Sequence, residues 1–292
     1  MLACPRCGLP LEGTGCANGH HYDLRAGVLD AVVSVEDPLT ARVGAFYEEC
    51  PFPDWGPDDD RDHLLEAGRQ NAMLRWLDER IPPRARVVEL GCGTGQLPLF
   101  LGLAGREVLG VDLSMASLQV AEGFRRRLDL PMVRFARGDL FRPPVLPGCA
   151  DVAISTGVLH HTGDPRRGFR VLCGLVRPGG LVVVGLYNRV GRWLLPLLRG
   201  RHRRAEGARG RAWFRDQHEH PHESRHSVAE VRGWFAAEGL SFVAAFPPIV
   251  LGGAGGEGDP GSAWENRLAE LSWLPRAEDG GLFVLIGVRT LQ

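Results

Sequence analysis

Lysine is missing from this chain: all 34 of its basic side chains are arginines, and 35 aspartates and glutamates balance them. The formal net charge is −1 and the isoelectric point is about 6.8. Proteins that bind nucleic acid through electrostatics usually carry a clear excess of positive charge. The composition therefore excludes a strongly basic nucleic-acid-binding surface at the level of the whole chain.

Hydrophobic runs long enough to cross a bilayer are missing as well, because runs such as residues 181–186 have only the length of a strand. No basic segment followed by an apolar one opens the sequence, and Cys4 comes too early for a signal peptide. Four cysteines stand alone in the body of the chain, which indicates reduced thiols: Cys50, Cys92, Cys149 and Cys173. We therefore expect a cytoplasmic protein.

Composition divides the chain into three parts. Residues 1–33 form a short glycine-rich module with three cysteines and two histidines. Residues 34–60 form a connector rich in proline and aspartate, and residues 61–292 form one large domain with a polar insert at 188–226. The connector also carries aromatic residues, which a free linker would lack. We expect it to act as a lid or to pack against the edge of a sheet.

Strand-like and helix-like patterns alternate through the large domain. Strands are predicted over residues 86–90, 107–112, 132–137, 152–155, 181–186, 240–246 and 282–288. Helices are predicted over residues 64–81, 97–104, 115–128, 164–176 and 227–237. This rhythm is typical of an α/β domain with a doubly wound, mostly parallel sheet of seven strands and helices on both faces.

A glycine-rich turn joins the first predicted strand to its helix in the stretch V-V-E-L-G-C-G-T-G, residues 87–95. Glycines at Gly91, Gly93 and Gly95 let the backbone turn sharply and approach a ligand closely. Asp112 ends the next strand about 20 residues further on, which is the distance at which a carboxylate accepts from ribose hydroxyls. The pattern predicts a nucleotide-like ligand at the carboxyl edge of the sheet, although a turn without a ligand gives the same glycines.

The spacing of the glycines argues against a dinucleotide. The dinucleotide fingerprint needs a third glycine at the start of the helix, where this chain has Gln96. Glu89 at the end of the strand would also disfavour a nearby pyrophosphate. A ligand that carries a sulfonium and an ammonium group tolerates this carboxylate well, so we expect S-adenosyl-L-methionine (SAM).

At these residues the chain resembles the class I SAM-dependent methyltransferases of the type 11/12 kind. E-L-G-C-G-T-G, residues 89–95, is similar to their first motif, and G-D-L (138–140), S-T-G-V-L-H-H (155–161) and R-P-G-G (177–180) are similar to later motifs in the same order. The resemblance implies that Asp112 holds the ribose diol and that Asp139 contacts the adenine amine. It implies these cofactor-binding residues: Glu89, Gly91, Cys92, Gly93, Gly95, Asp112, Leu113, Asp139, Leu140 and Thr156.

Histidines are the candidates for chemistry on the methyl acceptor. His160 and His161 follow the fourth strand of the predicted sheet, and either is a plausible base or a group that shapes the pocket. The insert adds His218, His220, His222 and His226. It can be a solvated loop, a metal site, or a wall that faces the substrate. The catalytic candidates are His160, His161, His220 and His222.

The N-terminal module has the spacing C-x2-C-x8-C-x3-H, formed by Cys4, Cys7, Cys16 and His20. Four such ligands suit tetrahedral zinc, which would supply the stability that 33 residues cannot obtain from a core. His21 remains an alternative fourth ligand, and a degenerate ribbon without metal remains open. The segment resembles the zinc ribbon that precedes guanine-N1 ribosomal RNA methyltransferases.

The function expected from the sequence is SAM-dependent methyl transfer to a small molecule. The ribbon raises an RNA methyltransferase as an alternative, to which an arginine run at residues 199–211 could add phosphate contacts, although such runs are usually solvated loops. A non-catalytic module that binds SAM or a partner is the third alternative.

Overall fold

A computed structural model gives the fold of this chain. It describes residues 1–35, 37–56, 59–193, 214–215, 218–251, 257–274 and 281–290. The arginine run at 199–211 and most of the insert at 188–226 lie outside the described residues. Within them, no helix is both long and apolar enough to span a membrane.

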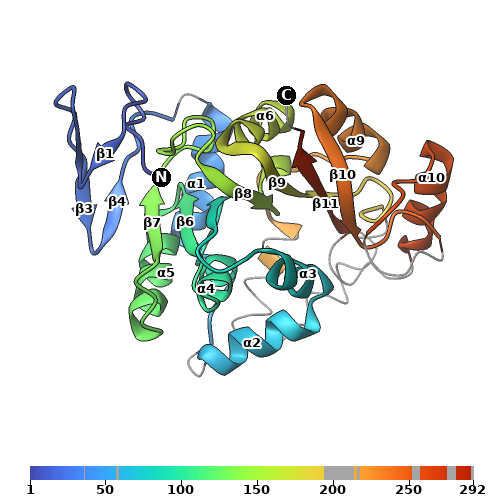
Figure 1. Cartoon of the computed structure of the whole chain (residues 1–292), viewed down its shortest axis with the longest axis horizontal. Coiled ribbons are helices and arrows are strands. Elements are labelled where there is room, and N and C mark those ends of the chain that lie inside the picture. Colours follow the sequence, from blue (N-terminus) through green and yellow to red (C-terminus); the bar gives the residue numbers. More distant parts are fainter. Residues whose placement is uncertain are drawn as a thin grey trace.

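A mostly parallel sheet forms the centre of the molecule, in the order β10-β11-β9-β8-β5-β6-β7-β4-β3 (Figure 1). Neighbouring strands from β4 to β9 run parallel, and β3, β10 and β11 pair antiparallel. Its strands are β3 (Asp23–Arg25), β4 (Val28–Asp30), β5 (Arg86–Leu90), β6 (Glu107–Asp112), β7 (Val133–Arg137), β8 (Ala150–Thr156), β9 (Val176–Tyr187), β10 (Leu240–Phe246) and β11 (Leu282–Arg289). The predicted doubly wound α/β sheet is confirmed.

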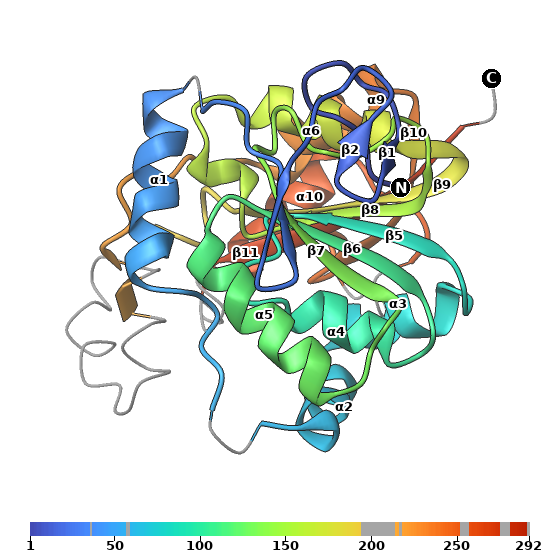
Figure 2. The same cartoon turned by 90° about the vertical axis from the view of Figure 1, so that its left-hand side faces the viewer.

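The sheet has nine strands in the described part of the chain, where the sequence predicted seven. The two additional strands are β3 and β4 from the N-terminal module. Asp30 of β4 pairs with Arg137 of β7, and Leu29 with Ala136. The module thus extends the sheet at its β7 edge, and Figure 2 views the molecule from this side. Its remaining strands, β1 (Leu11–Glu12) and β2 (Gly15–Cys16), form a small hairpin.

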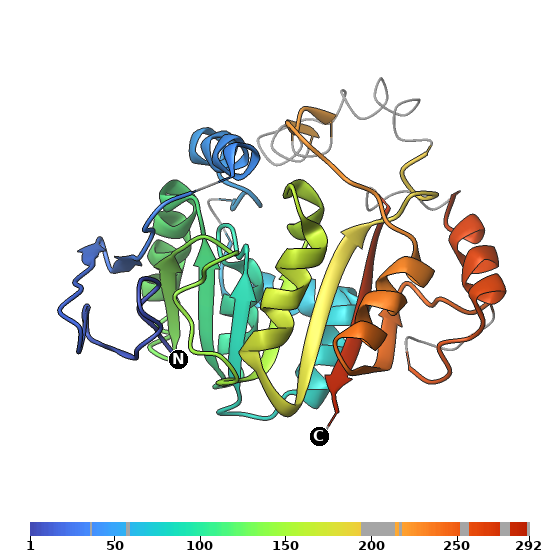
Figure 3. The ribbon, with the colours of Figure 1, turned by 90° about the horizontal axis from the view of Figure 1, so that it is seen from above.

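Helices cover both faces of the sheet (Figure 2). One face packs against α6 (Pro165–Leu175) and α9 (Val228–Ala237) in one hydrophobic core, and the other packs against α3 (Ala72–Arg80), α4 (Gln96–Gly102) and α5 (Met115–Arg127) in a second. α1 (Pro38–Glu49) lies across the end of the sheet toward which β9 points (Figure 3). The carboxyl ends of the parallel strands therefore meet under α1.

Local capping explains where the helices begin. The predicted helix at 64–81 is split into α2 (Arg61–Gln70) and α3, because the Asn71 side chain accepts from Leu74 N and starts a new helix. The Ser227 side chain caps α9 by accepting from Glu230 N, and the carboxylate of Glu230 bonds His226. The sequence analysis also missed α10 (Ala263–Ser272), which a complete Ser262–Glu265 capping box begins.

Candidate functional site

The glycine-rich turn after β5 needs glycine for two physical reasons. Gly91, Gly93 and Gly95 have φ angles of 78°, 51° and 81°, in the left-handed region that other residues rarely adopt. A Cβ atom at Gly93 would also collide with the carbonyl oxygen of Phe52, and one at Gly91 with Val158. The turn therefore has room for backbone only.

The connector lies directly on this turn. Phe52 O accepts from Thr94 N at 3.2 Å, Pro53 O accepts from the Thr94 hydroxyl, and Trp55 Nε1 donates to Thr94 O at 3.0 Å. Phe52 and Pro53 also line the cavity beside the turn. Residues 52–55 of the connector therefore pack against the glycine turn.

Asp112 lies at the carboxyl end of β6, beside the turn. Its Oδ2 accepts from Gly93 N at 2.8 Å and its Oδ1 accepts from Ser114 N at 2.9 Å. Burial raises the pKa of this carboxyl, although these backbone donors act to lower it. Each carboxylate oxygen keeps a further lone pair for a ligand hydroxyl.

Glu89 lies at the end of β5 and is only 5% exposed. Its Oε2 atom has no hydrogen-bond partner among the described residues, and the side chain lines the cavity. Burial and the nearby charge of Asp112 raise the pKa of Glu89 well above its usual range. A buried acceptor without a partner is costly, so the site fits a ligand that brings hydrogen-bond donors or positive charge.

A cavity of about 470 Å³ opens along the carboxyl ends of β5, β6 and β8. Eight predicted cofactor residues line it: Glu89, Gly91, Cys92, Gly93, Asp112, Leu113, Leu140 and Thr156. Gly95 instead begins α4 and packs against Phe135, and Asp139 accepts from Phe141 N at 2.9 Å. Gly138 lines the cavity, and the predicted Asp139 next to it does not.

Three further residues that line the cavity were not predicted from the sequence. Tyr47 of α1, Leu74 of α3 and Tyr187 at the end of β9 all face the cavity. The aromatic content of the connector was a usable signal for Tyr47. Leu74 shows the helical spacing of an ordinary core residue, and nothing in the sequence separates the two roles.

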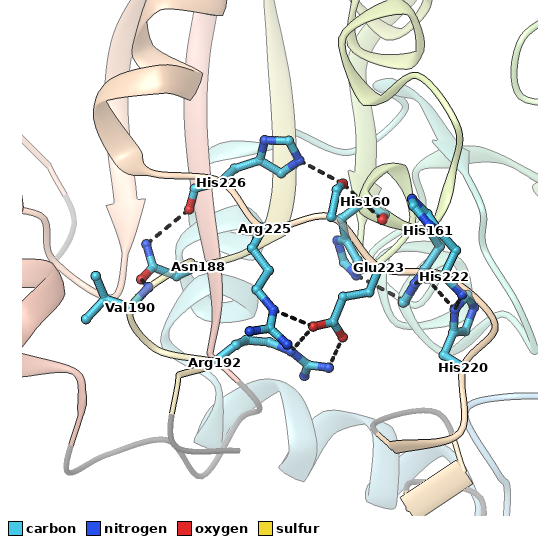
Figure 4. Close-up of polar contacts among 11 residues, drawn as sticks. His160, His161, Asn188, Val190, Arg192, His220, His222, Glu223, Arg225 and His226 are labelled. Atoms are coloured by element: carbon cyan, nitrogen blue, oxygen red, sulfur yellow. Dashed lines mark hydrogen bonds and ion pairs between the residues drawn. The ribbon is translucent and has the colours of Figure 1, made fainter. Parts of the chain in front are cut away.

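Four histidines from two distant segments meet beside this cavity (Figure 4). His160 and His161 lie in a short 3-10 helix, Leu159–His161, with their Nε2 atoms 3.1 Å apart. The His161 ring stacks on His220 at 3.5 Å between centroids. The backbone carbonyl of His222 lies 2.7 Å from His161 Nδ1 and 2.6 Å from His220 Nδ1.

The carbonyl fixes the tautomer of His161. A carbonyl oxygen can only accept, so the Nδ1 atom of His161 carries a proton, whereas His220 Nδ1 lies within reach of both the carbonyl and the amide of His222. His161 Nε2 is then a lone pair, and His160 must donate to it from Nε2. His160 Nδ1 and His220 Nε2 are left without a partner among the described residues.

Burial lowers the pKa values of His160, His161 and His220, which favours their neutral forms. Burial, with the nearby charges of His161 and Arg192, holds the pKa of His160 well below its usual range. Burial and His220 do the same for His161. Burial also lowers the pKa of His220 to about 4.

The predicted catalytic residues do not all line the cavity. His161 lines the cavity, His160 lies behind it against Tyr187, and His220 contacts Phe46 and Tyr47 of α1. His226 bonds Ser224 and Glu230 instead of joining a metal-like cluster. Among the described residues, the grouping that could hold a metal ion is the one in the N-terminal module.

That grouping is formed by Cys4, Cys7, Cys16 and His20, whose ligand atoms all lie within 4.8 Å of one another. Cys7 and Cys16 sulfurs are 3.7 Å apart, and His20 Nδ1 is 3.4 Å from Cys4 Sγ and 3.5 Å from Cys16 Sγ. A tetrahedral zinc ion holds such atoms roughly 3.5–3.8 Å apart, given its bond lengths to sulfur and nitrogen. The separation is far longer than a disulfide bond.

Comparisons with known proteins agree with this geometry. Residues 88–184 match the family model described as "Methyltransferase domain". An uncharacterized protein of Synechococcus is 27% identical over 260 residues, which cover 72% of this chain and 61% of that protein. A ubiquinone biosynthesis O-methyltransferase of Marinobacter nauticus is 31% identical over 119 residues, 40% of this chain and 50% of that enzyme.

The chain spans about half to three-fifths of the length of these curated relatives. Among solved structures, geranyl diphosphate C-methyltransferase from Streptomyces coelicolor has a TM-score of 0.55 at 16% identity, covering 88% of this chain and all of that chain. The [4+2]-cyclase SpnF has the same TM-score and identity, covering 92% of this chain and all of that chain. At such low identity these two likenesses establish a shared fold.

Proposed function

We propose that this chain, whose residues 88–184 match a methyltransferase domain, is a class I SAM-dependent methyltransferase that methylates a small molecule. The observation that carries the proposal is Glu89, a buried carboxylate with a bare Oε2 in the cavity beside Asp112. The ammonium and sulfonium groups of SAM would satisfy it. The ubiquinone biosynthesis O-methyltransferases among the relatives support a small-molecule acceptor.

The cofactor residues follow from this assignment. Asp112 would hold the ribose hydroxyls with its remaining lone pairs. The bare backbone of the glycine turn would admit the methionine part, and Gly138 and Leu140 would flank the adenine. Leu113, Cys92 and Thr156 complete the lining. Incubation with methyl-labelled SAM, metabolite pools and total RNA tests the function: label in neither pool would contradict it.

RNA is the second candidate, and the Cys3His cluster favours it through its likeness to a ribosomal RNA methyltransferase ribbon. Label in the RNA fraction would select it. A non-catalytic module that binds SAM or a partner is the third candidate. The [4+2]-cyclase SpnF shares this fold, so the fold alone does not imply methyl transfer. SAM binding without label transfer to any pool would favour that reading.

We also propose a structural zinc ion held by Cys4, Cys7, Cys16 and His20. The match of their spacing to a zinc tetrahedron supports it. Burial alone would raise the pKa of Cys4, but donors from Tyr22 and the backbone lower it to about 6, which favours the thiolate that binds zinc. We further propose that the chain divides into a module at residues 1–33, a connector at 34–60 and a domain at 61–292.

The histidines are proposed to form a wall that positions the methyl acceptor. Transfer from a sulfonium is an in-line displacement, and accurate placement of the nucleophile can supply much of its catalysis. The lone pair of His161 Nε2 already accepts from His160. His161 can take a proton from an acceptor only after His160 releases this bond, so orientation is its first role.

We expect His220→Ala to slow methyl transfer by about tenfold to a hundredfold, because it removes the ring that stacks on His161. His222→Ala should change the rate little, because His222 acts through its backbone carbonyl. SAM affinity, measured by calorimetry, should be intact in both variants. Equal rates in wild type and His220→Ala would rule out the wall.

The buried histidines should make the protein acid-sensitive. The unfolded chain takes up a proton on each histidine near pH 6.5, whereas folded His220 does so only near pH 4. Stability is therefore fully present above pH 6.5 and is lost as the pH falls toward 4, by on the order of 3 kcal/mol from His220. Urea unfolding between pH 7.5 and 4.5 measures this. His220→Phe should flatten the slope, and an unchanged slope would contradict the assignment.

A further inference from the structure

The part of the cavity beyond the cofactor residues is apolar. Its side chains come from α1 to α4, and the main ones are Val43, Leu64, Met73, Leu74, Leu97 and Phe100. The polar groups on this side are the amides of Asn71 and Gln96 and the hydroxyls of Thr40 and Tyr47. Such a surface suits the body of a hydrophobic ligand, because removing methylene groups from water is favourable.

Positive charge is absent from the lining within the described residues. The carboxyl and imidazole side chains that line the cavity are those of Glu89, Asp112 and His161. The first two are acids, and burial keeps His161 neutral. The chain has no lysine anywhere.

Two arginines that contact residues of the lining already have partners. Arg192 is buried, pairs with Glu223 and stacks on Tyr187, with its guanidinium carbon 3.7 Å from the ring centroid. Arg137 donates to Leu113 O at 2.9 Å and lies 3.5 Å from Asp30. Neither guanidinium lines the cavity, so neither is available to a buried anion.

A phosphate or carboxylate on the acceptor would therefore be buried beside two acids, with no unpaired counter-charge from the described residues. Burial of an unpaired charge is costly. With Arg192 engaged by Glu223, the remaining cation would be the sulfonium of SAM, which becomes a neutral thioether when the methyl group leaves. An anionic acceptor would lose even this partner at the moment of product formation.

We propose that the acceptor is an uncharged, largely apolar small molecule with a single methylatable polar atom, and that phosphate-bearing acceptors, RNA included, are rejected. This inference rests on the proposed function. Its apolar body would lie against α3 and α4, and its polar atom would face His161 and Tyr187, which also line the cavity.

Matched probes test the inference in the presence of S-adenosylhomocysteine. The pairs are 1-naphthol with 1-naphthyl phosphate, and geraniol with geranyl diphosphate. We expect each neutral probe to bind at least about tenfold more tightly than its phosphorylated partner. Equal or tighter binding of the phosphorylated probes, or no binding of either neutral probe at millimolar concentration, would overturn the proposal.

A charge variant provides the matched control. Leu74→Arg places a cation in the lining and should reverse the preference, while Leu271→Arg on the exposed face of α10 should leave it unchanged. No reversal in Leu74→Arg would also count against the proposal. Calorimetry with SAM on the same samples separates the two levels: absent SAM binding overturns the proposed function, whereas normal SAM binding with tight phosphate binding overturns only the acceptor class.

Discussion

Asp112→Ala should weaken SAM binding by about a hundredfold or more, as measured by calorimetry. The variant would lose the two charge-assisted hydrogen bonds that we propose to the ribose hydroxyls, each of about 1.5–3 kcal/mol. It also frees Gly93 N and Ser114 N, which hold the glycine turn and the start of α5 in position. Asp112→Asn should give a smaller but still large loss of SAM affinity, because only the oxygen of the amide can accept hydrogen bonds.

Asp151→Ala is the matched control for this experiment. Asp151 is also a hydrogen-bonded carboxylate of the sheet, but it lies near the amino end of β8, where it contacts Arg86 and Arg177. Its removal should leave SAM affinity unchanged. Asp139→Ala should have little effect as well, since Asp139 does not line the cavity. Unaltered affinity in Asp112→Ala would remove this residue from the cofactor site.

Removal of the proposed zinc ion should strongly destabilise the N-terminal module. Structural zinc sites of this type contribute about 10–16 kcal/mol to folding of small modules. We expect one zinc per chain by elemental analysis, and its loss in Cys4→Ser/Cys7→Ser with a marked fall in Tm. Without metal, β4 should release the β7 edge, and hydrogen exchange of residues 133–137 should rise.

Single-site controls sharpen this test. Cys149→Ser alters a cysteine outside the cluster and should retain zinc. His20→Ala should lose metal and His21→Ala should keep it, since His20 Nδ1 is the nitrogen within reach of two sulfurs. A purified protein without metal, or full retention in the double cysteine variant, would contradict the zinc site.

The sequence predicted what depends on short-range patterns. The strand–turn–helix unit around Gly91–Gly95 and the strands that follow it have local signals, and the structure confirms the sheet that they form. The helix break at Asn71 and the capping box of Ser262 and Glu265 also have local signals in the sequence, although neither was predicted. Pairing of β4 with β7 has no such signal, because it joins residues more than a hundred positions apart.

The candidate site shows the same division. The glycines and carboxylates beside the turn could be predicted from the sequence, because the tight turn needs glycine and the proposed ligand contacts need a carboxylate. The contribution of His222 could not be predicted from the sequence, because it comes from a backbone carbonyl that any residue would supply. Leu74 and Tyr187 likewise face the cavity only because of the way distant elements pack.

The pairing of β4 with β7 has a consequence for biosynthesis. Asp30 and Arg137, which meet across this edge, are 107 residues apart, so at ordinary translation rates β7 is made roughly 5–20 seconds after β4. The four metal ligands, in contrast, all lie within residues 4–20 and leave the ribosome together. Zinc captured by the nascent chain would keep the first hairpins folded during this interval, so that they are ready to dock when their partner strand emerges.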